Sequence, residues 1–300
     1  MKKKVVSATV TPLMEDGSLD GRGLCNLIDR GARHKLDGMF LFGSMGEWGG
    51  FSDALKEEGV ELASGYVKNR FELLVGINAT SLPLSLDLMK RYRKYDFSAY
   101  VFMPPGRTSE LDPVKSVLTV LDTSDRPVYL YHCPPNNGIN FTLNDFATMM
   151  RHPNLKGIKN SSSDMYLRRE LLLLREDMGA KTLFFEGQEW AADEALIVGC
   201  DGVICGMGAV CSKLMRQLAD CVDSGDIVGA VAVQNRMIRI FHGIYGPHIE
   251  NCWNGQKYAL VKMGLIATPY TIAQEMSSLT DTAKSRIEKC LAEFKDDLDF

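Results

Sequence analysis

Short runs of apolar and β-branched residues recur at fairly regular intervals along the first two thirds of the chain. Each run is bounded by Gly, Pro, Asn or Asp, and most are almost continuously apolar, which is typical of strands buried on both faces of a parallel sheet. The pattern predicts eight strands, at residues 5–10, 38–43, 72–78, 98–103, 127–132, 155–160, 181–186 and 201–205.

Between these strands the apolar residues follow helical spacing. Residues 19–35, for example, place Leu24, Leu27 and Ile28 on one face. The same spacing predicts helices at 53–67, 82–94, 112–121, 165–176, 191–198 and 212–223. This alternation favours a (β/α)₈ barrel over an open doubly wound sheet, although periodicity alone does not show that a sheet closes.

After Ser224 and Gly225 the strand pattern stops and only helical segments follow, at 226–242, 255–263 and 280–297. This tail is too short for an independent enzyme domain. We therefore predict a catalytic barrel over residues 1–224 and a helical extension over residues 225–300 that packs on it.

Composition narrows the class of partner. The formal net charge of −4 gives no general basic footprint for nucleic acid, so we expect a small-molecule partner. No stretch approaches the roughly 18 apolar residues that a membrane helix needs, and the segment after Lys2–Lys4 is too short and polar for the core of a signal peptide. The eight cysteines form no CxxC pair and lie mostly in apolar runs, which favours reduced thiols in a cytoplasmic protein without zinc.

Lys159 is the most informative candidate for chemistry, because active sites of α/β barrels lie where the strands end. It closes the strand predicted at 155–160. An ammonium group is costly in the low dielectric of a barrel mouth, so we expect a lowered pKa and a nucleophilic amine that attacks a ketone. The alternative is a lysine that reaches solvent or pairs with a carboxylate.

Two hydroxyl groups strengthen this hypothesis. Tyr131 ends the strand next to that of Lys159, and its phenol can pass protons if a second hydroxyl, such as that of Ser44, relays them. The alternative for Tyr131 is a buried phenol that binds a backbone carbonyl. Ser44 belongs to the glycine-rich turn 43–47 (Gly-Ser-Met-Gly-Glu), whose backbone N–H groups suit the carboxylate of a 2-oxo acid.

These residues, in this order, resemble the dihydrodipicolinate synthase and N-acetylneuraminate lyase family over nearly the whole chain. The motifs that carry the resemblance are Val10-Thr11-Pro12, the turn 43–47, Tyr131 with Pro134, Gly157-Ile158-Lys159 and Asp201-Gly202-Val203-Ile204. The resemblance implies class I aldolase chemistry on a (β/α)₈ barrel, usually as a homotetramer and without a metal or organic cofactor. It implies that Lys159 forms a Schiff base, usually with pyruvate, that Tyr131 shuttles a proton, and that Ser44 relays it. It further implies that Ser44 and the Met45 backbone hold the carboxylate.

The sequence departs from the synthase branch at three places. Family members usually carry two hydroxyl or small polar residues between the glycines of the turn, whereas the second position here is Met45. The synthase branch places an Arg shortly after the strand-five Tyr, but no Arg follows Tyr131 before Arg151. Its relay Tyr after strand four, which crosses a subunit contact, also has no counterpart at 103–107. These departures argue against dihydrodipicolinate synthase activity.

The N-acetylneuraminate lyase branch has no such Arg and reads sugar hydroxyls with acids after strand seven, where Gln188 and Glu189 stand here. Trp190 falls where a second acid is expected. We expect His132 and Trp48 to line the pocket or form its wall, and Glu47 to hold the turn. The predicted substrate-binding residues are Gly43, Met45, Gly46, Asn136, Gly187, Gln188, Glu189, Cys205 and Gly206.

The sequence therefore predicts a Schiff-base lyase or aldolase that joins or separates pyruvate, or another 2-oxo acid, and an aldehyde, with a hydroxylated, sugar-acid-like substrate favoured. The alternatives are a 2-keto-3-deoxy sugar acid dehydratase, 4-hydroxy-tetrahydrodipicolinate synthase, and a ligand-binding homologue that kept the fold without the reaction. We expect no nucleic-acid partner and no membrane partner.

Overall fold

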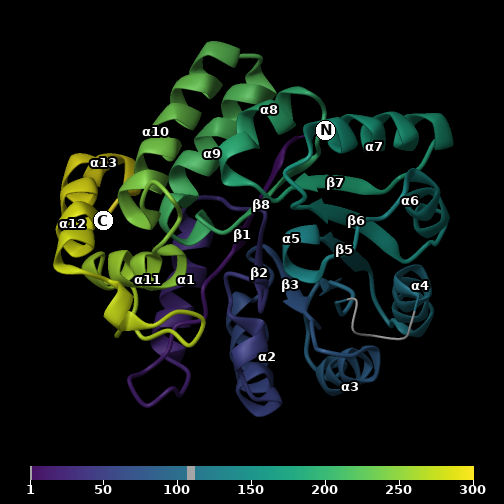
Figure 1. Cartoon of the computed structure of the whole chain (residues 1–300), viewed down its shortest axis with the longest axis horizontal. Helices are drawn as coiled ribbons and strands as arrows, with labels where there is room; N and C mark the ends of the chain where they lie inside the picture. The colour runs from purple at the N-terminus through teal and green to yellow at the C-terminus, as the bar shows by residue number, and fades with distance from the viewer. Residues whose placement is uncertain (1, 107–111) are drawn as a thin grey trace.

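Each of the eight predicted apolar runs forms a strand, and every strand pairs in parallel with its neighbours along the chain. A computed structural model describes residues 2–106 and 112–300 (Figure 1). The strands are β1 (Lys4–Ala8), β2 (Gly38–Leu41), β3 (Glu72–Gly76), β4 (Ala99–Phe102), β5 (Val128–His132), β6 (Leu155–Asn160), β7 (Leu183–Glu186) and β8 (Gly202–Cys205). β1 also pairs with β8, so the sheet closes into a barrel. The predicted (β/α)₈ class is confirmed, and the open sheet is wrong.

Helices surround the barrel (Figure 1). Several begin at side chains that accept backbone N–H groups, as Asp20, Ser52 and Asp164 do. The barrel helices are α1 (Gly21–Arg33), α2 (Asp53–Val67), α3 (Leu82–Tyr92), α4 (Pro113–Thr123), α5 (Pro134–Asn137), α6 (Leu143–Met150), α7 (Met165–Met178), α8 (Ala192–Ile197) and α9 (Gly208–Ser224). Three short 3₁₀ segments, Trp48–Gly50, Glu189–Ala191 and Met276–Ser278, complete the loops.

The sequence interpretation missed α5 and α6, which connect β5 to β6. A capping box between Thr142 and Asp145 starts α6 and marks this helix in the sequence. The single helix expected at 280–297 is also wrong, because the chain breaks at Phe294 into α12 (Asp281–Glu293) and α13 (Lys295–Leu298). Phe294 leaves the helical conformation, with φ −106° and ψ 24°, and its ring is buried in the core.

Alternation along the strands separates the barrel interior from the face that packs on the helices. Tyr129, Tyr131, Phe185 and their interior partners form one cluster. Gly157 leaves room for it, since a Cβ there would lie 2.7 Å from the Tyr129 ring. Apolar rings thus fill the barrel, and polar side chains gather where the strands end.

The chain after residue 224 forms α10 (Ile227–Tyr245), α11 (Cys252–Lys262), α12 and α13, which lie on one side of the barrel (Figure 1). α10 packs along α9. The last residues return to α1, where buried Arg30 donates hydrogen bonds to the carbonyls of Leu298 and Asp299. Within the described residues, no helix has both the length and the apolar character that would let it span a membrane.

Candidate active site

Lys159 lies near the carboxyl end of β6, with its side chain turned into the barrel. The residue is only 4% exposed. Its Nζ lies 4.1 Å from the ring centroid of Tyr131 and 5.3 Å from that of Phe40. Burial lowers the pKa of Lys159 from its ordinary value of 10.5, while Glu189 and Glu186 oppose that shift. None of the salt bridges in the described part of the chain includes Lys159, so the amine is more readily neutral than an exposed lysine.

Gly187 makes the space that the Lys159 side chain occupies. A Cβ at this position would lie 2.9 Å from Lys159 Cε and 1.9 Å from Ser161 Oγ. The Gly187 N–H donates to the Asn160 carbonyl at 2.8 Å, so the loop after β7 runs directly beside the amine. The sequence interpretation named Gly187 as substrate-binding, and the structure places it against the side chain proposed to react.

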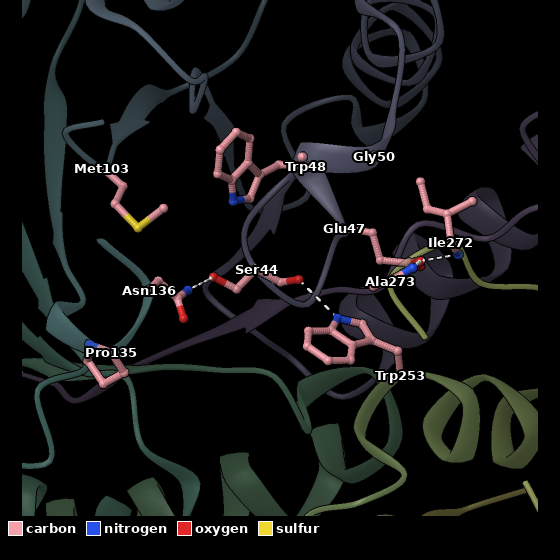
Figure 2. Close-up of a pocket in the computed structure, with 11 residues that line it drawn as sticks. Ser44, Glu47, Trp48, Gly50, Met103, Pro135, Asn136, Trp253, Ile272 and Ala273 are labelled. Atoms are coloured by element: carbon pink, nitrogen blue, oxygen red, sulfur yellow. Dashed lines mark hydrogen bonds between the residues drawn. The ribbon is translucent and has the colours of Figure 1, made fainter. Parts of the chain in front are cut away.

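Tyr131 and Lys159 are paired across β5 and β6. The Tyr131 hydroxyl lies 3.2 Å from Ser44 Oγ, and Asn136 Nδ2 donates to the same Ser44 oxygen at 2.6 Å. Burial raises the pKa of Tyr131 well above its ordinary value of 10, so the resting phenol keeps its proton. The three side chains form one hydrogen-bonded series from the barrel interior to exposed Asn136. Figure 2 shows the bond between Asn136 and Ser44.

The turn 43–47 is held from several directions. The Thr11 hydroxyl donates to the Gly46 carbonyl at 2.7 Å, and the Trp253 indole N–H donates to the Ser44 carbonyl at 3.0 Å. Glu47 adopts a left-handed conformation (φ 57°) and is fully buried in an ion pair with Lys257 of α11. Both ends of the turn are therefore fixed to other parts of the fold.

The second carboxylate oxygen of Glu47 accepts hydrogen bonds from the Thr271 hydroxyl and from the N–H groups of Ile272 and Ala273. Because both oxygens are engaged, Glu47 holds the turn to the C-terminal extension. Sequence reasoning expected this structural part for Glu47.

The Met45 side chain packs against α11 and Gly206. Its Sδ lies 3.6 Å from Cys252 Sγ on α11, and its Cγ would lie 2.4 Å from a Cβ on Gly206. Gly206 is therefore required for the close packing of Met45. The missing hydroxyl at position 45 does not interrupt the contact between Ser44 and Tyr131.

The polar groups after β7 are largely engaged within the protein. Gln188 Nε2 donates to the Ser161 carbonyl at 3.1 Å and to Ser163 Oγ at 2.7 Å. One Glu189 oxygen accepts from the Met207 N–H at 2.8 Å, and burial raises the pKa of Glu189. These bonds hold the two side chains against the loops that follow β6 and β8.

Two expected pocket residues face elsewhere. Cys205 is fully buried in the cluster between the barrel and the helices. Its thiol therefore faces the helices, and the predicted substrate-binding position for Cys205 is wrong. His132 alternates with Tyr131 and packs outward, with ring centroids 5.7 Å from Phe141 and 5.3 Å from Phe146. Burial lowers the pKa of His132 to about 4, which keeps it neutral in this apolar setting.

A cavity of about 570 Å³ opens beside Ser44 (Figure 2). Its lining residues are Ser44, Glu47, Trp48, Gly49, Gly50, Met103, Pro135, Asn136, Trp253, Ile272 and Ala273. Sequence reasoning named Ser44, Trp48 and Asn136 for the pocket but missed the three residues from the C-terminal extension. No local pattern marks those three, since the contacts join segments more than 200 residues apart.

Metal-binding chemistry has no obvious donors in residues 2–106 and 112–300. No group of three His, Cys, Asp or Glu side chains comes together there in a way that could hold a metal ion. The eight cysteines are all free thiols.

Comparisons with known proteins extend this picture. The profile of the Dihydrodipicolinate synthetase family matches residues 1–294. A 4-hydroxy-tetrahydrodipicolinate synthase from Streptococcus gordonii is 25% identical over 238 residues, which cover 78% of this chain and 75% of that protein.

Two solved structures share the fold. YagE from E. coli K12, described as a prophage protein of the dihydrodipicolinic acid synthase family in complex with pyruvate, has a TM-score of 0.88 at 21% identity and covers 98% of both chains. CdNal from Clostridium difficile, in complex with mannosamine, has a TM-score of 0.87 at 22% identity and covers 97% of this chain and 99% of its own.

Proposed function

The chain belongs to the dihydrodipicolinate synthetase family, and from this we propose that it is a class I lyase in which Lys159 forms a Schiff base with a 2-oxo acid. The observation that carries the proposal is a buried amine without an ion pair in the described residues, set beside a protonated phenol. Pyruvate is the proposed 2-oxo acid, because the similar protein YagE was crystallised with it.

The reaction begins when the neutral Lys159 amine attacks the C2 carbonyl of pyruvate. Tyr131 donates a proton to the developing hydroxyl, which leaves as water and yields the iminium. The iminium withdraws electrons from the methyl carbon, and the Tyr131 phenolate removes a proton from it to give an enamine. Asn136 orients the Ser44 hydroxyl, and Ser44 stabilises the phenolate through the 3.2 Å contact.

Carbon–carbon bond formation follows at that enamine. Its nucleophilic carbon attacks the aldehyde carbonyl carbon, and the aldehyde oxygen takes the proton from Tyr131. Water then adds to the new iminium, a proton returns to the Tyr131 phenolate, and the 4-hydroxy-2-oxo acid leaves together with the neutral lysine. The reverse sequence cleaves the same acid. We propose that backbone N–H groups of the turn 43–47, including those of Ser44 and Met45, hold the pyruvate carboxylate.

The second substrate is less constrained by these residues. A hydroxylated aldehyde remains a candidate, and the mannosamine complex of CdNal supports it. Gln188 and Glu189, which follow β7, are its proposed partners. Dehydration of a hydroxylated 2-oxo acid through the same iminium is the related alternative. Dihydrodipicolinate synthase activity is disfavoured because no Arg lines the described part of the cavity. Assembly as a homotetramer and a cytoplasmic location stay predictions.

Reductive trapping tests the Schiff base directly. Incubation with pyruvate and borohydride, followed by peptide mass spectrometry, should place a reduced pyruvyl group on Lys159. The matched control is Lys156→Ala, which removes an exposed lysine from the same strand and should leave trapping intact, whereas Lys159→Ala should abolish it. An unmodified protein, or an adduct at another lysine, contradicts the proposal.

A further inference from the structure

The described lining of the cavity beside Ser44 consists mainly of aromatic and apolar side chains, with few polar groups. We propose that the second substrate is an aldehyde bearing an uncharged aromatic group, which lies in this cavity against Trp48. This inference rests on the proposed Schiff-base function and specifies its acceptor.

The cavity adjoins the reacting pair through Ser44, and we propose that the growing end of a Lys159 adduct enters it from there. Ser44 is part of the cavity lining and contacts the Tyr131 hydroxyl, and the Tyr131 ring lies 4.1 Å from Lys159 Nζ. Trp48 packs against the interior cluster that contains Tyr131 and Met103. The cavity volume of about 570 Å³ falls within the range of roughly 300–1,000 Å³ typical of small-molecule sites. A two- or three-carbon aldehyde would leave most of it unfilled.

Charged acceptors find no partner in this lining. The only ionisable side chain among the described lining residues is Glu47. Lys257 and the 271–273 segment already engage both of its oxygens. Within the described lining, a second carboxylate or a phosphate on the acceptor would therefore be desolvated without a cation to compensate it.

Hydrogen-bonding capacity is also small. The Ser44 carbonyl is taken by Trp253, and the Ser44 hydroxyl by Tyr131 and Asn136. The carbonyl oxygen of the Asn136 side chain and the indole N–H of Trp48 have no bond within the described residues. Gln188 and Glu189 are not among the described lining residues, so a polyhydroxylated chain placed in this cavity would leave several hydroxyls unpaired. A flat ring would instead cover the indole of Trp48 and the side chain of Met103 (Figure 2).

A panel of acceptors tests the inference at saturating pyruvate. We expect kcat/KM for benzaldehyde to exceed that for aspartate semialdehyde and for N-acetylmannosamine by about tenfold or more. Trp48→Ala should raise KM for benzaldehyde about tenfold, because it removes the stacking surface. Trp48→Phe should restore most of the affinity. The rate of borohydride trapping with pyruvate should be unchanged in both variants.

The matched control is Trp190→Ala. Trp190 is 41% exposed and packs edge-on against Phe241, outside the cavity, so its loss should not alter acceptor preference. A preference for the charged or the polyhydroxylated aldehyde overturns the inference. So does an equal effect of Trp48→Ala on all acceptors, or a failure to consume any aromatic aldehyde while the pyruvyl adduct forms. Absence of that adduct is a different result, which overturns the proposed function itself.

Discussion

Burial acts in opposite directions on the pKa values of the two ionisable groups at the barrel mouth. It lowers the pKa of Lys159 and raises that of Tyr131. Both shifts favour the uncharged form, so a nucleophilic amine and a proton-donating phenol coexist over a wider pH range than exposed side chains would allow. The chemistry proposed for Lys159 needs this combination, because attack requires a free electron pair and loss of water requires a proton.

The lowered pKa of Lys159 predicts how adduct formation depends on pH. The ammonium form is not nucleophilic, so the trapping rate should rise as pH increases through the pKa of Lys159 and then level off. Because burial lowers that pKa, the midpoint should lie below the ordinary value of 10.5. Initial rates of borohydride trapping, measured across a pH series, give the midpoint. A midpoint at or above 10.5 would show that the amine faces water.

Tyr131→Phe tests the proton shuttle. Losing the phenol should lower kcat by about 10²–10³ and change KM for pyruvate little, because general acid–base catalysis contributes at this level. The matched control is Tyr129→Phe, on the same strand and the same interior face. Tyr129 does not contact Ser44 in the described hydrogen bonds, so its variant should stay within about threefold of the parent. Steady-state kinetics with equal losses in both variants would remove Tyr131 from the mechanism.

Among single residues, the proposed reacting groups could be predicted from the sequence, whereas the orientation of the residues next to them could not. Lys159, Tyr131 and Ser44 could be predicted because each lies at or just beyond the end of a recognisable strand. The side of the barrel that each residue faces could not, since the runs are apolar on both faces and a shift of one residue reverses inside and outside. That ambiguity explains why His132 and Cys205 were placed in the pocket although they face the helices.

At the scale of elements, strands were easier to predict than the connections that shape the cavity. Continuous apolar runs gave all eight strands to within a few residues. The β5–β6 connection was missed because α5 is only one turn long and α6 is short. Yet α5 carries Asn136, so an element too short for periodicity contributes a group to the proposed relay.

The contact between the turn 43–47 and α11 makes a testable claim about stability. Lys257→Met leaves the Glu47 carboxylate buried without its partner, which should cost about 3–5 kcal/mol of unfolding free energy in urea. Adding Glu47→Gln should recover part of that loss, because no buried charge remains. The matched control is Lys262→Met on the same helix, which breaks an exposed pair with Glu288 and should change stability little. Equal losses from the two lysine variants would argue against a specific effect of burial.

At the scale of the whole molecule, the helices after residue 224 belong to the site as well as to the scaffold. They bring Trp253 to the Ser44 carbonyl, and the segment after α11 brings Ile272 and Ala273 to the cavity. The sequence predicted an appendage packed on the barrel, and nothing in its periodicity indicated that it would reach the mouth. The division into a barrel and an extension at residue 224 stays a prediction. α10, which follows it, packs along α9 of the barrel.

Truncation tests whether the extension is only an appendage packed on the barrel or is also needed for the active site. A fragment of residues 1–224 loses Lys257 and Trp253 and uncovers the face of α9 that packs on α10. We expect it to lack a cooperative unfolding transition and to form no pyruvyl adduct. The matched control, deletion of residues 295–300, removes the carbonyls that Arg30 binds, the carboxylates that His34 and Arg236 contact, and the buried Leu298 side chain, but no residue of the cavity. It should lower the Tm yet still trap pyruvate at Lys159. Full trapping by the 1–224 fragment would mean that the barrel forms its site without the extension. The contacts of Trp253 and Lys257 with the turn 43–47 would then stabilise the fold but not support the chemistry.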